Sequence, residues 1–369
     1  MHQLSISDTK DFVKQIALIH REPVMIWGSP GIGKSEGIAQ LAAEEPGDIL
    51  VDIRLGQYDS VDLRGFPGVK NVTVPAHNLP GENLSVTALA ALNRTVDLTV
   101  WYAPSTIPFK GNPKFEAVKG RIWLFLDELN AANNAVAGVA YQLINDRAVG
   151  EHQLLDNVII ICAGNREGDK GVTNKQPLPL SNRLVHCEAV VSVDDFCLYH
   201  QAKGTIPPIA LAFYQFRKDL LNTFDPSKPG IKAFSTPRTA EKAWKFFADP
   251  GMPEKIKNAA MAGAIGDGPA AEAIGFAKIW DTLKDYLPKI RKDPAGCDLP
   301  KTPGLRYAIT MALAGEMSPK TVKDLHTFLQ RLDPEFCVLA WQFAVKRDPA
   351  MFATPEFISF SKKYKAVFS

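Results

Sequence analysis

One stretch, "VMIWGSPGIGKSEGI" at residues 24–38, constrains the fold of this chain more than any other. Its apolar first half predicts a buried strand, and a turn with three glycines and a proline follows at once. Within it, Gly28, Gly33, Lys34 and Ser35 spell the pattern G-x-x-x-x-G-K-S. A strand before this pattern and a helix after it form the context in which such a turn surrounds a chain of phosphates.

The turn has the chemistry of a phosphate-binding site. Glycines let several backbone N–H groups point inward, because no Cβ stands in the way. Lys34 can then reach the β- and γ-phosphates, the Ser35 hydroxyl can bind Mg²⁺, and the N-terminus of the following helix adds positive charge. We expect ATP and Mg²⁺ as cofactors, bound by Gly28, Ser29, Pro30, Gly31, Ile32, Gly33, Lys34 and Ser35.

A nucleotide site of this kind predicts an acidic residue at the end of another buried strand, and "WLFLDE" at residues 123–128 supplies two. We expect Asp127 to hold Mg²⁺ through water and Glu128 to polarise the water that attacks the γ-phosphate. The competing interpretation is an acidic pair that only caps a strand end in solvent. The glycine turn elsewhere in the chain favours the catalytic interpretation.

Three further polar residues complete the candidate site. Asn165 follows the apolar run "NVIIICA" and is expected beside the acidic pair, where its amide can orient the water near the γ-phosphate. Arg183 precedes the next strand, and Arg238 begins a helix in "FSTPRTAEKAW". The planar donor fork of arginine suits phosphate oxygens. The alternatives are a turn cap for Asn165 and surface salt bridges for the two arginines.

The spacing of apolar residues predicts an α/β fold with a doubly wound parallel sheet. Near-continuous apolar runs mark strands that are buried on both faces, and they lie at 23–27, 48–53, 121–128, 157–163 and 184–191. Helical patterns at 34–45 and 133–147 fit crossover helices. After about residue 191 helical patterns dominate, at 208–224, 236–249, 270–287, 322–332 and 334–347.

These patterns predict three domains: an α/β nucleotide-binding domain at 1–190, a helical lid at 191–287 and a C-terminal helical extension at 288–369. A linker at 288–304 is expected to separate the last two. The segment 54–120 interrupts the α/β pattern with many prolines and glycines. It is too long to be a loop without secondary structure of its own. We expect an inserted hairpin or short helices there, and a hairpin or turn at 146–159.

Composition argues against several classes of protein. The 42 basic and 40 acidic residues leave a net charge of +2, which disfavours a nucleic-acid coat or a polybasic membrane clamp but leaves a local basic patch open. The five cysteines include no CxxC pair and the seven histidines show no ligand spacing, so neither disulfides nor zinc are indicated. No apolar run is long enough to span a membrane, and no signal for secretion opens the sequence. We expect a cytoplasmic protein.

The combined motifs resemble those of AAA+ ATPases, and more narrowly those of the MoxR family. The resemblance rests on "GSPGIGKS", "WLFLDELNAA", "AGNREGDKG...LPLSNRLVH" and "FSTPRTAEKAW", and on "DSVDLRGFPG" at 59–68. It covers about residues 1–280. It implies a P-loop AAA+ parallel-sheet core with inserted hairpins, followed by an all-α lid. Residues 54–120 and 146–157 match the positions of the family's insertions.

The resemblance also implies a homo-oligomeric ring, usually of six subunits, with ATP at each subunit boundary. The implied roles are Walker A for Lys34 and Ser35, Walker B for Asp127 and Glu128, sensor one for Asn165, the arginine finger presented to the neighbour for Arg183, and sensor two for Arg238. Arg147 and Arg166 stay open as alternative arginine fingers. Such proteins commonly remodel or activate a partner that carries a von Willebrand factor A domain.

Three other functions compete with this one. A DNA helicase or translocase shares the ring core, but no stripe of basic and aromatic residues marks the insertion. A GTPase is disfavoured, because Pro177 in "TNKQP" at 173–177 stands where guanine recognition needs an aspartate. A scaffold that does not hydrolyse nucleotide would be expected to lack Glu128. ATP hydrolysis is therefore the favoured prediction, with a DNA-acting ring motor as the alternative.

Overall fold

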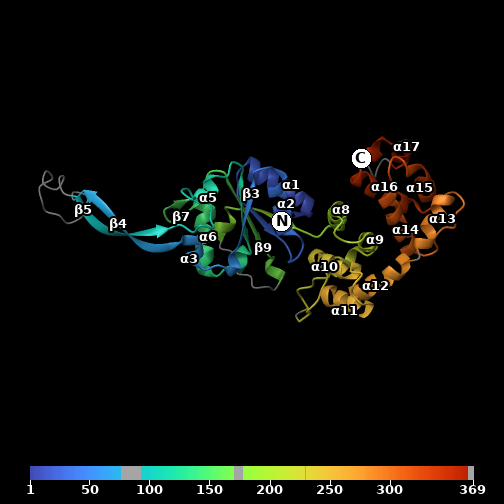
Figure 1. Cartoon of the computed structure of the whole chain (residues 1–369), viewed down its shortest axis with the longest axis horizontal. Coiled ribbons are helices and arrows are strands. Elements are labelled where there is room, and N and C mark those ends of the chain that lie inside the picture. Colours follow the sequence, from blue (N-terminus) through green and yellow to red (C-terminus); the bar gives the residue numbers. More distant parts are fainter. Residues whose placement is uncertain (76–92, 170–177, 229, 282, 365–369) are drawn as a thin grey trace. The chain divides into compact units, whose positions relative to one another are not determined.

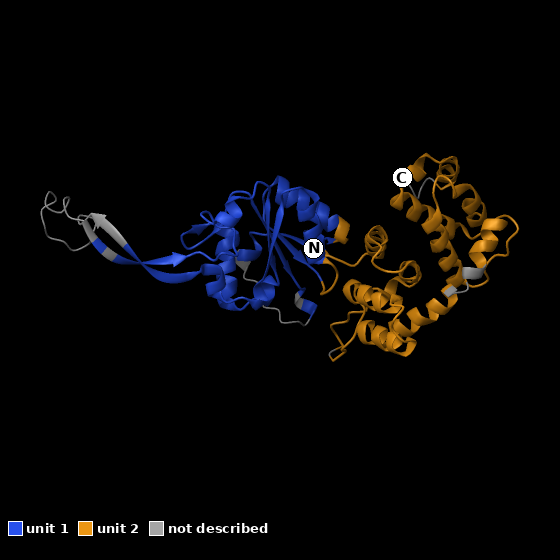
Figure 2. Cartoon of the chain, viewed as in Figure 1, with its two compact units in different colours: residues 1–3, 8–28, 34–188 blue, residues 4–7, 29–33, 189–369 orange. Residues whose placement is uncertain are grey.

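The computed structural model describes residues 1–75, 93–169, 178–228, 230–281 and 283–364. The chain forms two compact units, which Figure 2 shows in different colours. Unit 1 comprises residues 1–3, 8–28 and 34–188, and unit 2 comprises residues 4–7, 29–33 and 189–369. Each unit has a hydrophobic core of its own.

Unit 1 is built around a six-stranded sheet (Figure 1) with the strand order β1-β10-β2-β9-β6-β3. From β10 to β3, each strand runs parallel to its neighbour. All four residues of β2 are buried, as are five of the six in β6, which explains why these strands are apolar without alternation. The strands are β1 Gln3–Leu4, β2 Val24–Trp27, β3 Ile49–Arg54, β6 Ile122–Asp127, β9 Val158–Gly164 and β10 Val185–Ala189.

Helices flank this sheet and complete its core. In α6 (Asn134–Asp146), Val136, Val139, Ala140 and Leu143 are buried at the spacing that predicted this helix. The predicted α/β class with a parallel sheet is therefore confirmed. The other helices in this part of the chain are α1 Ile6–Val13 with its π-helical continuation Lys14–Ile19, α2 Lys34–Glu44, α3 Ser60–Arg64, α5 Pro113–Glu116 and α7 Leu178–Ser181, and short 3₁₀ turns lie at Leu55–Gln57, Leu129–Ala131 and Glu167–Asp169.

The insertion at 54–120 contains the expected hairpin. β4 (Phe66–Pro75) and β5 (Asn93–Tyr102) pair antiparallel along their whole length, and Figure 1 shows them as a ribbon that leaves the parallel sheet. The residues between them, 76–92, lie outside the described part of the chain. Of the hairpin or turn expected at 146–159, the structure has the hairpin, because β7 (Ala148–Val149) pairs with β8 (His152–Gln153) directly before β9.

From residue 193 onward, unit 2 is helical. Its buried apolar residues form one cluster, and Trp244 and Trp341 lie fully buried within it. The all-α part that the sequence predicts after the sheet is therefore confirmed. The helices are α8 Val193–Lys203, α9 Pro208–Phe216, α10 Pro237–Ala248, α11 Glu254–Ile265, α12 Asp267–Asp281, α13 Leu283–Lys292, α14 Pro303–Glu316, α15 Val322–Leu329, α16 Pro334–Arg347 and α17 Pro355–Lys363, with 3₁₀ turns at Lys218–Leu220 and Pro349–Ala353.

The linker expected at 288–304 begins later than the sequence suggests. Pro288 lies inside α13, which continues to Lys292. Leu283 and Ile290 are buried and lie seven residues apart, and Leu287 between them in the sequence packs against the same core. This apolar face, which extends to both sides of the proline, stabilises the helix there. The predicted boundary between lid and extension at 287/288 thus falls within a helix, and residues on both sides of it belong to one core.

All five cysteines of the chain are free thiols, and four of them are buried. Burial raises the pKa of the Cys187 thiol to about 12, so that this thiol stays protonated at neutral pH. None of the helices in the described part of the chain combines the length and the hydropathy that crossing a bilayer requires.

A buried histidine in unit 2 should make its stability depend on pH. His200 is 3 % exposed and its Nδ1 lies 2.5 Å from the Thr205 hydroxyl. Burial lowers the pKa of His200 to about 4, whereas an unfolded histidine titrates near 6.5. As the pH falls from about 6.5 towards 4, the unfolded chain therefore binds a proton that the folded chain does not, and up to about 3 kcal/mol of stability is lost.

Urea unfolding of the wild type and His200→Gln between pH 4 and 8 measures this contribution. The difference in unfolding free energy between the two proteins should be constant above about pH 7 and shrink as the pH falls. Only the wild type has a histidine at this position that takes up a proton on unfolding, so only its stability contains this pH-dependent contribution. His20→Gln makes the same chemical change at an exposed position and is the matched control. A difference between His200→Gln and wild type that does not change with pH would contradict the expectation.

Candidate functional site

Several of the predicted site residues lie close together in unit 1, at the carboxyl ends of three neighbouring strands of the sheet. β9 pairs with β2 on one side and with β6 on the other. The glycine turn leaves the end of β2, Asp127 ends β6, and Asn165 directly follows β9. Crevices at the carboxyl ends of parallel strands are where open α/β sheets bind their ligands.

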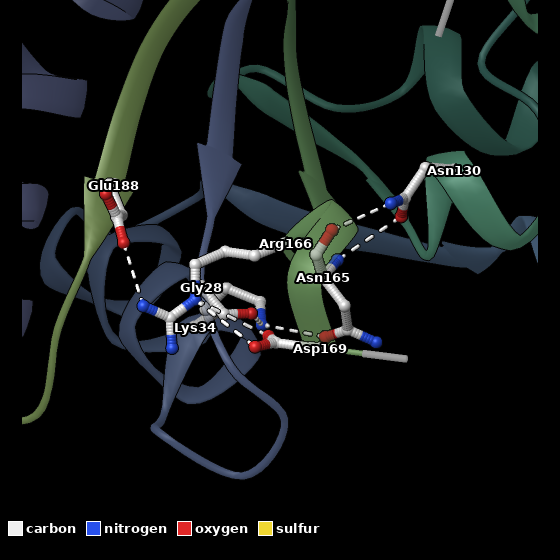
Figure 3. A network of polar contacts seen from close by, with 7 residues as sticks. All are labelled: Gly28, Lys34, Asn130, Asn165, Arg166, Asp169 and Glu188. Atoms are coloured by element: carbon white, nitrogen blue, oxygen red, sulfur yellow. Dashed lines mark hydrogen bonds and ion pairs between the residues drawn. The ribbon is translucent and has the colours of Figure 1, made fainter. Parts of the chain in front are cut away.

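Lys34 lies in the middle of this group, at the start of α2. Its Nζ donates a hydrogen bond to the Gly28 carbonyl at 2.6 Å and another to Asn165 Oδ1 at 3.4 Å, as Figure 3 shows. The Lys34 ammonium thus connects the start of the glycine turn to the side-chain amide that follows the neighbouring strand β9. The N-terminal end of the α2 dipole lies at the same place, so the local field favours an anion.

The Mg²⁺ ligands that the sequence predicts are in contact. Ser35 Oγ donates to Asp127 Oδ2 at 2.8 Å, and Asp127 Oδ1 accepts from the Glu128 backbone N–H at 2.9 Å. A hydroxyl and a carboxylate are hard oxygen donors, and Mg²⁺ commonly takes one or two such protein ligands together with phosphate oxygens and water. These residues therefore fit Mg²⁺. In the described part of the chain, no group of three His, Cys, Asp or Glu side chains forms an all-protein metal site.

Glu128 has an unusual backbone conformation. It lies in the left-handed region, with φ 57° and ψ 35°, where residues other than glycine are uncommon. A Cβ built on Gly56 would come within 2.8 Å of Glu128 Oε2, so the carboxylate lies close against this glycine. A conformation of this kind costs about 1–3 kcal/mol and tends to persist where it orients a functional group.

A further carboxylate near the site escaped the sequence prediction. Asp52 on β3 pairs in register with Phe125, two residues before Asp127. Partial burial and the charge of Asp127 raise the pKa of Asp52, against an opposing effect of Arg54. An acidic residue inside an apolar strand was the available signal, but its position beside Asp127 depends on strand order, which the sequence alone does not give.

The glycine turn itself needs glycine at two positions. Gly31 has φ 77° and Gly33 has φ 108°, which side chains rarely adopt. A Cβ on Gly31 would also lie 2.8 Å from the Thr236 hydroxyl, within unit 2. In the same unit the Arg238 backbone N–H donates to the Gly31 carbonyl at 3.1 Å. A role of the Arg238 side chain at the nucleotide stays a prediction. The remaining turn residues are Ser29 and Ile32, which are buried, and Pro30, which is half-buried.

The three candidate arginine fingers differ in their surroundings. Arg183 is exposed, and no hydrogen bond or ion pair joins its side chain to another described residue. Arg147 Nη2 donates to the carbonyls of Leu155 and Val158, at 3.3 and 2.7 Å, and so fastens the short hairpin to β9. Of these two, Arg183 is the arginine whose guanidinium is available to another molecule.

Arg166, the third candidate, is already held by two carboxylates. Its Nη1 donates to Glu188 at 2.9 Å and its Nε lies 3.5 Å from Asp169, as the dashed lines in Figure 3 indicate. Use of this side chain by a neighbouring subunit would require both ion pairs to open. The sequence "TNKQP" at 173–177, weighed above for guanine recognition, lies outside the described residues.

Asn130 was not predicted, yet it contacts Asn165 directly. Its Nδ2 donates to the Asn165 carbonyl at 2.7 Å, and its Oδ1 accepts from the Asn165 N–H at 3.2 Å (Figure 3). The side chain is 3 % exposed. The asparagine in "DELNAA", in a segment that is otherwise apolar after the acidic pair, was the signal available in the sequence.

Comparison with known proteins gives little beyond this geometry. No family model matches the chain, and no curated protein matches it. A structure of NtrX from Brucella abortus in complex with ADP is 11% identical, with a TM-score of 0.39, over 99% of this chain and 68% of that one. A RuvB mutant from Thermotoga maritima is 14% identical (TM-score 0.35; 76% of each chain). A putative ATPase from Cytophaga hutchinsonii is 10% identical (TM-score 0.30; 92% and 83%).

Proposed function

We propose that this chain is a Mg²⁺-dependent ATPase of the AAA+ kind, and that it resembles the MoxR family in its use of ATP hydrolysis to remodel or activate a partner protein. One observation carries the proposal. The side chains of Lys34 and Ser35 contact Asn165 and Asp127 at the ends of neighbouring parallel strands, as a phosphate-binding turn with a metal-binding carboxylate requires.

Each residue has a distinct part in the proposed reaction. Lys34 and the N–H groups of the turn bind the β- and γ-phosphates, while Ser35 and Asp127 would hold Mg²⁺. When bound, the metal neutralises charge that develops on the phosphate oxygens. Glu128 orients the attacking water and accepts its proton, and the Asn165 amide fixes the position of that water. The chain thus supplies mainly orientation and electrostatic stabilisation.

The finer parts of the proposal concern assembly and partner. We propose a homo-oligomeric ring, six subunits in the family it resembles, in which Arg183 of one subunit completes the ATP site of the next. The exposure of Arg183 supports this assignment, because a trans-acting arginine must reach beyond its own subunit. A partner with a von Willebrand factor A domain follows from the resemblance alone.

The rate of ATP hydrolysis per subunit, measured against protein concentration, tests the proposal. With Mg²⁺ the specific rate should rise with concentration and then level off as subunits assemble, and EDTA should abolish it. The same assay with duplex DNA and with single strands tests the ring-motor alternative. Along β4 and β5 only Lys70 and Arg94 are basic, so we expect no stimulation. Strong stimulation by DNA would favour the motor, and absence of any ATPase activity would refute both.

A further inference from the structure

We infer that Asn130 is a positioning residue for ATP hydrolysis: it holds Asn165 by the backbone and so sets the place of the Asn165 amide relative to Lys34 and the acidic pair. This inference rests on the proposed function, because it assigns Asn165 the role of orienting the attacking water. It concerns a buried residue that is not among those assigned above to the nucleotide.

The contacts of Asn130 are specific to one residue. Its amide group forms two hydrogen bonds, one to the N–H and one to the carbonyl of Asn165, at 3.2 and 2.7 Å. Donor faces acceptor in both cases, so the primary amide is used as a two-point clamp on a single peptide segment. Because the two hydrogen bonds hold the backbone on both sides of the Asn165 Cα, they restrict the position of this Cα and therefore of the side chain attached to it.

The surroundings leave the clamp little freedom. Asn130 is 3 % exposed, and a Cβ on Gly164 would come within 2.6 Å of its Oδ1 and 2.7 Å of Met25 Cε. The Gly164 carbonyl in turn accepts from the Gly28 N–H at 3.3 Å. The segment 164–165 is therefore fixed from both sides, by the start of the phosphate-binding turn and by Asn130.

The position of Asn130 in the chain links this clamp to Glu128, the proposed general base. Asn130 lies on the 3₁₀ turn that follows Glu128, two residues further on. Asp127, Glu128 and the clamp thus belong to one short segment, which contacts the Ser35 hydroxyl at one end and Asn165 at the other. Loss of the clamp should let Asn165 move relative to Glu128 while the phosphate-binding turn stays intact.

Asn130→Ala tests this inference by kinetics. Without the clamp the attacking water is poorly placed, so we expect kcat to fall by about 10- to 100-fold, with KM for ATP nearly unchanged. In an Asn165→Ala background the same substitution should have almost no further effect, because the amide it positions is gone. Asn130→Ser keeps the site polar and serves as the second variant if the alanine variant folds poorly.

Asn133→Ala is the matched control. Asn133 lies three residues further along the same segment and accepts a hydrogen bond from Val136 N–H at 2.9 Å as the cap of α6, without any contact to Asn165. Its loss should lower stability but leave kcat within about threefold of wild type, since a cap mainly affects the helix. A similar fall in kcat for both variants, or additive effects of Asn130→Ala and Asn165→Ala, would overturn the inference.

Hydrogen exchange at the Asn165 amide gives a readout that does not need turnover. In the wild type this N–H is bonded to Asn130 Oδ1, so its exchange should be at least about tenfold faster in Asn130→Ala, with the amides of Cys162 and Ala163 unchanged. Unchanged exchange at Asn165 would refute the clamp whatever the activity. A wild type that shows this protection but hydrolyses no ATP would instead refute the proposed function.

Discussion

Replacement of Glu128 by glutamine should abolish ATP turnover while ATP binding and assembly remain. The amide has the size of the carboxylate but cannot accept a proton from the attacking water, so kcat should fall by about 10²- to 10⁴-fold. Lys34 and Ser35, which we assign to phosphate and metal, donate hydrogen bonds to the Gly28 carbonyl and to Asp127, so the substitution leaves these contacts in place. Steady-state turnover, measured beside ATP affinity from a fluorescent analogue, separates the two effects.

The control for this substitution is Glu151→Gln, at an exposed glutamate in the turn between β7 and β8. It makes the same chemical change away from the site and should leave both turnover and affinity as in the wild type. Full activity in Glu128→Gln would remove this residue from the mechanism. A loss of affinity as large as the loss of turnover would mean that Glu128 acts in binding and that its left-handed backbone serves the turn alone.

The residues that the sequence predicts best are those set by local chemistry. The glycine turn, Lys34 and Ser35 lie between a strand and a helix whose apolar spacing is clear over a few residues, and Asp127 ends a fully apolar strand. The proximity of the glycine turn to Asp127 was also predictable, because the carboxyl ends of parallel strands lie at the same edge of a sheet. The contact between Ser35 and Asp127 is the clearest example.

What the sequence did not predict depends on contacts between distant segments. Asn165 was expected beside the acidic pair, but its contact with Asn130 depends on how the 3₁₀ turn after β6 lies against the end of β9. The position of Asp52 requires β3 to pair with β6. In the helical part, α8, α11, α14 and α17 were not among the predicted segments. α11 and α14 are rich in alanine and glycine, so their apolar faces stand out weakly against the rest of each helix.

The expected helix at 208–224 also ends earlier than predicted, for a local reason. α9 stops at Phe216, and Arg217 leaves the helical region with φ −122° and ψ 72°. Its guanidinium forms a bidentate pair with Asp219, at 3.1 and 2.9 Å. A periodic apolar pattern continues past this point in the sequence, but the chain turns there, so periodicity alone overestimated the helix.

Arg183→Ala should reduce ATP turnover by about 10³-fold or more, and a mixture with Glu128→Gln should restore part of it. The arginine stabilises charge that develops on the γ-phosphate, and in the proposed ring it does so in the neighbouring site. Each variant alone is inactive for a different reason. In a mixed ring, a boundary with Glu128 on one subunit and Arg183 on the next is complete, and random mixing of equal amounts makes about one boundary in four of this type.

The mixing experiment distinguishes an arginine that acts across the boundary from one that acts within its own subunit. Activity that returns on mixing, and grows with the time allowed for subunit exchange, requires that the two residues meet from different chains. A mixture that stays inactive after exchange has been verified would place Arg183 in the site of its own subunit, or remove it from catalysis. Arg166→Ala is the comparison, because its guanidinium pairs with Glu188 and Asp169 of its own chain. Its loss should cost stability, and mixing with Glu128→Gln should add no activity beyond what it retains alone.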